Sequence, residues 1–129
     1  MSSMRIAVVA VLAGVLLAAC TDSAPAYDAE DFRAGECRTV MPAAFAIDAA
    51  VQAGGDDSAG TAGKITPEQD TLRAALPGLT EAPVATATQS LVSKVGFYRI
   101  GVDAKNFTPK LASDLRAAYD ALASVCATG

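Results

Sequence analysis

The strongest constraint on the fold is a helical spacing of apolar residues between residues 37 and 126. In the first segment that carries it, the apolar positions lie three and four residues apart, which places them on one side of an α-helix. Gly54 and Gly55 end this segment. Pro42 interrupts it, so the helix either begins near Pro42 or is longer and kinked there. The stripe consists of Cys37, Val40, Ala44, Ile47 and Val51.

The second helical segment is predicted from its boundary signals. Residues 54–63 hold four glycines and no large apolar residue, so we expect a flexible linker. Thr66 followed by Pro67 is a typical helix start, with Thr66 as the N-cap and Pro67 in the first turn. This helix is expected to end before Pro77.

Two more helices are expected in the second half of the chain. A stripe with helical spacing runs from Val84 to Val102. Residues 96–102 also leave a strand open as the alternative, because they are rich in β-branched and aromatic side chains. The pair Thr108-Pro109 marks the start of the last helix, which carries an apolar face up to Cys126.

The first 20 residues have the layout of a secretory signal. Arg5 precedes an apolar run of 11 residues, Ile6 to Leu16, which is too short to span a bilayer as a helix. The tetrapeptide Leu17-Ala18-Ala19-Cys20 resembles the lipobox of bacterial lipoproteins. This resemblance implies that residues 1–19 are a signal peptide and that the Cys20 thiol carries a diacylglyceryl group. The protein would then be held at the cell membrane, on its extracytoplasmic face.

Residues 20–36 are expected to form the lipidated N-terminus and a flexible acidic tether. Two acyl chains on Cys20 are enough for stable anchoring, so no transmembrane helix is required. The following segment contains Pro25, small residues and several acids, a composition typical of a solvated spacer. Its acids are Asp22, Asp28, Glu30 and Asp31.

Lipidation of Cys20 would leave two cysteines, Cys37 and Cys126, in a chain that matures outside the cytoplasm. We expect them to form one disulfide; two free thiols or a redox pair are the alternatives, and no C-x-x-C spacing supports the latter. In an antiparallel four-helix arrangement, the start of the first helix and the end of the fourth lie at the same end. We therefore expect an all-α, up-down-up-down four-helix bundle over residues 37–129, closed by this disulfide.

Composition excludes several classes of function. The chain has 129 residues, enough for one domain, and a formal net charge of −4, which gives no basic footprint for nucleic acid. It contains no histidine, which removes His-based catalysis and His-ligated metal sites. The acids of the helical part form no recognisable pair by spacing. We expect no catalytic residue, no metal and no cofactor, hence not an enzyme.

The surface offers one candidate interaction site. Residues 84–129 hold five bases against three acids, whereas the preceding part of the mature chain is acidic. A basic face on the last two helices and their loop could meet an acidic partner or lipid headgroups; separate solvated side chains are the alternative. Its residues are Lys94, Arg99, Lys105, Lys110 and Arg116. The aromatic residues are expected to pack in or near the core: Phe45, Phe97, Tyr98, Phe107 and Tyr119.

The alanine-rich composition and the lipobox together resemble the small lipoproteins of high-GC actinobacteria, a resemblance that implies no particular activity. We expect a lipid-anchored, non-enzymatic accessory or binding subunit of an envelope protein or complex. The alternative is a carrier of a small hydrophobic ligand or lipid, held in a cavity between the helices.

Overall fold

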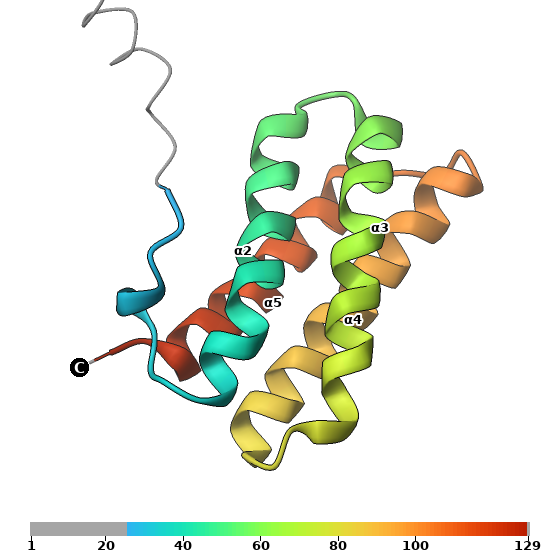
Figure 1. The fold of residues 1–129 in the computed structure, drawn as a ribbon. Helices are drawn as coiled ribbons and strands as arrows, with labels where there is room; N and C mark the ends of the chain where they lie inside the picture. Colours follow the sequence, from blue (N-terminus) through green and yellow to red (C-terminus); the bar gives the residue numbers. More distant parts are fainter. Residues whose placement is uncertain (1–25, 129) are drawn as a thin grey trace, which may run out of the picture.

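A computed structural model describes residues 26–128, which fold into a ring of four α-helices (Figure 1). Consecutive helices run in opposite directions, and α2 and α4 lie diagonally, each packed against both α3 and α5. The all-α, up-down-up-down four-helix bundle predicted from the sequence is confirmed. The elements are η1 (Ala29–Asp31), α2 (Glu36–Gly54), α3 (Ser58–Ala75), η2 (Leu76–Gly78), α4 (Ala82–Asp103) and α5 (Pro109–Cys126).

Helix α2 buries the predicted stripe and begins before the proline. It runs from Glu36 to Gly54 with Pro42 inside it, so the longer of the two alternatives is correct. The Pro42 side chain lies on the exposed side of the helix. Cys37, Val40, Ala44 and Ile47 of the stripe are fully buried, and Val51 is half-buried.

Helix α3 corrects two predictions. It begins at Ser58, so residues 58–63 of the expected linker are helical and Thr66 is not the N-cap. Pro67 lies inside the helix, with its side chain exposed. The Thr66 hydroxyl donates a hydrogen bond to the Ala62 carbonyl at 2.7 Å, one turn earlier, instead of capping a helix.

The reason for the early start is a capping residue together with an apolar contact. The Asp57 side chain accepts a hydrogen bond from the Gly60 backbone N–H at 2.9 Å, which satisfies one free donor of the first turn. Thr61 and Ile65 then lie on the buried side of α3. The cap and the burial of Ile65 offset the low helix propensity of the glycines and of the internal proline.

Helices α4 and α5 follow the sequence prediction closely. Residues 96–102 are helical, so the strand alternative is wrong. Helix α5 begins at Pro109 directly after Thr108, as expected, and ends at Cys126. The buried residues of the two helices that belong to the predicted stripes are Val84, Thr88, Leu91, Val95, Tyr98, Leu115, Ala118 and Leu122.

The segment from Tyr27 to Gly35, which we call the N-terminal strap, is folded against α2 and α5 (Figure 1). A flexible tether was expected over residues 20–36; residues 20–25 lie outside the described part, and from Tyr27 on the structure differs from that expectation. Phe32 is only 9% exposed and packs against Tyr27. Burial of these aromatic rings gives the segment the apolar contact that a solvated spacer lacks.

Candidate functional site

The five predicted basic residues do not form one face. The Arg99 guanidinium is directed towards α3, where it donates a hydrogen bond to the Gln69 side chain. Arg116 lies on the other side of the bundle, where it forms an ion pair with Asp48 of α2 at 3.3 Å. The two side chains therefore bind to different neighbouring helices.

The remaining members of the predicted face are also separate. Lys110 pairs with Asp114 on its own helix at 2.6 Å. Lys105 lies in the loop after α4 with a positive φ of 56°. Lys94 lies beside Phe97, with its Nζ atom 5.6 Å from the ring centroid. The alternative of separate solvated or locally paired side chains fits this arrangement better than a continuous basic face.

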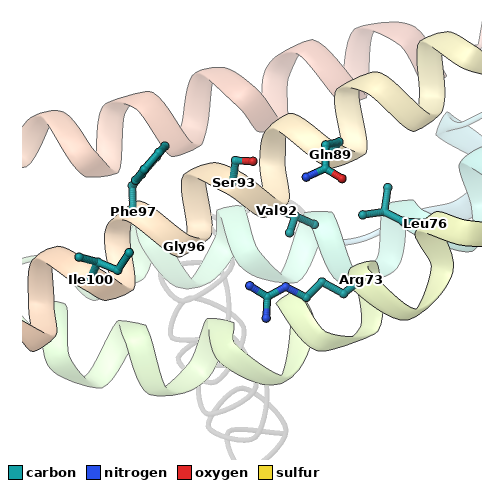
Figure 2. A pocket seen from close by; sticks show the side chains of 8 residues that line it. All are labelled: Arg73, Leu76, Gln89, Val92, Ser93, Gly96, Phe97 and Ile100. Carbon is teal, nitrogen blue, oxygen red and sulfur yellow. The ribbon is translucent and has the colours of Figure 1, made fainter.

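A groove lies between α3 and α4 (Figure 2). It has a volume of about 460 Å³. Arg73 extends into it from α3, and Leu76 from η2. Helix α4 contributes Gln89, Val92, Ser93, Gly96, Phe97 and Ile100. A second groove, of about 560 Å³, lies between η2 and α4 and shares Leu76 and Gln89 with the first.

Two large apolar side chains are exposed along this groove. Phe97 is 54% exposed and Ile100 is 63% exposed. The expectation that Phe97 packs in or near the core is therefore wrong, whereas Tyr98 and Tyr119 are buried and Phe45 and Phe107 are half-buried. Exposed large apolar side chains beside a concave surface are typical of binding sites.

The sequence contained a signal for this surface. The buried stripe of α4 passes through Val95 and Tyr98, so Phe97 and Ile100 are apolar residues outside the stripe. The same excess of apolar residues favoured the strand alternative over residues 96–102. The helical spacing thus identifies both residues as apolar positions on the polar side of the helix.

A polar cluster lies between α2 and α5. Asp48 is 8% exposed and accepts hydrogen bonds from Gln52 and Arg116. Burial, with the nearby carboxylates of Asp48 and Asp120 and with Tyr27, raises the pKa of Tyr119 to about 12. The Asp48 carboxylate joins α2 to α5 through its ion pair with Arg116, and the Tyr119 phenol stays protonated near neutral pH.

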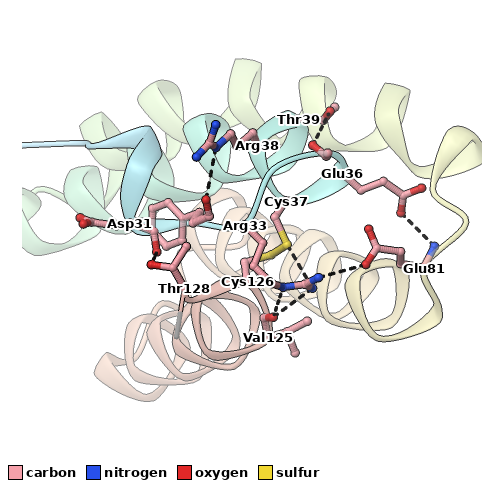
Figure 3. The surroundings of a disulfide bond; sticks show 12 residues. Asp31, Arg33, Glu36, Cys37, Arg38, Thr39, Glu81, Val125, Cys126 and Thr128 are labelled. Carbon is pink, nitrogen blue, oxygen red and sulfur yellow. Dashed lines mark hydrogen bonds and ion pairs between the residues drawn. A yellow bond between two sulfur atoms is a disulfide. The ribbon is translucent and has the colours of Figure 1, made fainter.

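The disulfide end is the third organised region (Figure 3). A bond joins Cys37 and Cys126, whose Cα atoms are 5.4 Å apart. The strap lies beside it: the Arg33 backbone N–H donates to the Cys126 carbonyl at 2.8 Å. The Arg33 guanidinium donates to the Val125 carbonyl at 3.2 Å and to the Cys37 sulfur at 3.5 Å. The predicted disulfide is present, and Arg33 ties the strap to both of its cysteines.

Glu36 connects α2 to the start of α4 at the same end. Its carboxylate accepts hydrogen bonds from the hydroxyl and the backbone N–H of Thr80, both at 2.7 Å, and from the backbone N–H of Glu81 at 2.9 Å. These bonds, that from the Thr80 hydroxyl first, hold the pKa of the Glu36 carboxyl below its ordinary value of 4.5. The charged form of Glu36 therefore stabilises the fold.

Glu36→Gln is expected to reduce the acid sensitivity of the bundle. Because the pKa of Glu36 is lowered in the folded state, its contribution is fully present above about 4.5 and is lost as the pH falls through the folded value. Urea midpoints measured from pH 7 to pH 3 should fall less steeply for Glu36→Gln than for the wild type. Glu30→Gln is the control, because Glu30 is exposed and its side chain binds no other described residue. Equal slopes for all three proteins would contradict this role of Glu36.

Within residues 26–128 no group of three or more possible metal ligands was found. No helix in that range is both long and apolar enough to cross a membrane. Cys20, the predicted lipidation site, and the rest of the lipobox lie outside the described residues.

Comparison with protein-family models gave no match, and comparisons with curated proteins and with solved structures gave none either.

Proposed function

We propose that this protein is a lipid-anchored, extracytoplasmic binding module that serves as a non-enzymatic accessory subunit of an envelope protein or complex. The observation that carries the proposal is the groove between α3 and α4, where Phe97 and Ile100 are exposed along about one turn of helix. Contacts of this kind contribute most of the binding energy when a partner covers them. The anchor is supported by the lipobox at residues 17–20.

The geometry favours docking of a protein over enclosure of a small molecule. The alternative function, carriage of a hydrophobic ligand, places the ligand in a cavity between the helices. Both grooves described above lie at the surface, the first between α3 and α4 and the second between η2 and α4, while the inner positions of the bundle are filled by buried side chains. A surface groove leaves one side of a ligand in water, whereas a small-molecule site buries most of it.

The test is crosslinking of the full chain in cells of its host, with a lysine-directed reagent and an affinity tag at the C-terminus. We expect a discrete adduct with one envelope protein, and a mass for the membrane-extracted protein that fits residues 20–129 plus diacylglyceryl. Cys20→Ala should release the protein from the membrane and remove the adduct. A Cys20→Ala chain that stays in the membrane, or a wild type without adduct, would overturn the proposal.

A further inference from the structure

We propose that the groove between α3 and α4 binds an amphipathic α-helix of the partner, and that an acidic side chain of that helix pairs with Arg73. This inference rests on the proposed function and describes the chemistry of its partner. Three properties of the groove support it, namely its length, its apolar lining and its charge.

The groove is long enough for a helix. Along α4 its lining extends from Gln89 to Ile100. At about 1.5 Å per residue this stretch is roughly 17 Å long, which matches a partner helix of about 12 residues, or three turns. An elongated groove can bind a helix that lies parallel to it, which is the helix-in-groove mode of recognition.

The lining supplies an apolar face to match the apolar side of such a helix. Val92 and Gly96 lie along α4 facing α3 and form the floor of the groove, with Val92 buried. Phe97 and Ile100 stand at the edge of the groove with more than half of each side chain exposed. Covering them with apolar residues at helical spacing removes this surface from water.

The charge of the groove indicates that the partner helix carries an acidic group. Arg73 is the one charged residue lining the groove, and it has no ion-pair partner among residues 26–128. Helix α4 contains no acid from Ala82 to Val102 and adds Lys94 beside Phe97. The groove lining therefore carries one positive charge, on a chain whose formal net charge is negative. An acidic group on the partner would satisfy Arg73 and fix the orientation of the helix.

The same charge argues against a second copy of this chain in the groove. A twofold dimer through this face would bring the positively charged groove of one copy against that of the other.

The N-terminal strap does not cover this face. It covers the α2 and α5 side of the ring, so the groove lies on the opposite side from the segment that leads to the predicted anchor (Figure 1).

The test uses the full chain in its host membrane, with the photoreactive residue p-benzoylphenylalanine placed at position 100 in one variant and at position 117 in a second. Ile100 lies at the groove, whereas Ala117 is exposed on α5. We expect an adduct with one envelope protein from position 100 only. Its crosslinked segment should have apolar residues three and four apart and an Asp or Glu beside them.

Charge reversal then tests the pairing. Arg73→Glu is expected to lower the yield of the adduct from position 100 at least tenfold, and replacing the mapped acid of the partner with Lys should restore it. Lys64→Glu is the matched control, because Lys64 is an exposed base of the same helix that does not line the groove. An equal loss with both substitutions would overturn the pairing with Arg73.

The outcomes separate this inference from the proposed function. An envelope protein captured from position 117 alone would support a binding module and overturn the groove as its docking site. A second copy of the chain or a lipid captured at position 100 would also overturn the inference. No adduct from either position would count against both.

Discussion

Replacing Cys37 and Cys126 together with alanine is expected to lower the free energy of unfolding by about 4 to 5 kcal/mol. The disulfide joins residues 89 positions apart, so it restricts nearly the whole described chain in the unfolded state. A domain of this size has a net stability of about 5 to 15 kcal/mol, and the loss is therefore about a quarter of it or more. Urea unfolding followed by circular dichroism measures the difference between the two proteins.

Reduction of the wild type provides the control for this prediction. Both cysteines are fully buried, so alanine also removes packed sulfur atoms, whereas a reductant leaves the side chains in place. The wild type unfolded in reductant should lose nearly the same free energy as the double variant if the constraint on the unfolded chain is the main cause. A loss below about 1 kcal/mol in both experiments would mean that the unfolded chain is already compact without the bond.

The sequence predicted the topology because two independent patterns agree. The stripes of α2 and α5 give helices with one apolar side, and the cysteines lie at the start of the first and the end of the last. Only an even number of antiparallel helices brings these two ends together over short connections. The buried faces of α2, α4 and α5 follow from the same spacing, so most of the core was predictable.

Helix α3 was predicted less well because its local signals conflict. The glycines before residue 64 and the pair Thr66-Pro67 both predict that the helix begins late. Both signals reflect only the intrinsic helix propensity and capping preference of the residues. Tertiary contact decided otherwise: Ile65 fills the core one turn before Gln69, and Asp57 caps the helix. The spacing of Ile65, Gln69 and Leu72 was present in the sequence. A polar Gln69 in the middle hid it, because its burial depends on hydrogen bonds to Arg99 and to the Val92 carbonyl.

The groove could be predicted only in part. Spacing identifies Phe97 and Ile100 as apolar residues outside the stripe of α4, but it cannot say which neighbouring helix lies beside them. The position of Arg73 at the groove could not be predicted either, because it follows from the packing of α3 against α4. Likewise, the predicted basic face grouped residues by sequence region, whereas Arg99 and Arg116 bind to opposite neighbours.

Phe32→Ala is expected to lower the free energy of unfolding by about 3 kcal/mol. Phe32 is nearly buried, and its ring stacks on Tyr27 with centroids 5.9 Å apart. Its removal should also loosen the neighbouring backbone pairs, in which Arg33 binds Cys126 and Thr128 binds Asp31. Urea unfolding gives the loss, and amide hydrogen exchange should show faster exchange at Arg33 and Thr128 than in the wild type.

Phe97→Ala is the matched control, because it removes the same ring from an exposed position and should cost no more than about 1 kcal/mol. Equal losses for the two variants would mean that the strap adds nothing to the fold, as expected of a flexible tether over residues 20–36.

Whether the strap is folded or released also matters for the proposed anchor. With the strap folded, only the seven residues Cys20 to Ala26 separate the predicted lipid from the bundle, and they span at most about 25 Å. A released strap would more than double that reach, so under the proposed anchoring the contacts of Phe32 would limit the distance between the groove and the membrane.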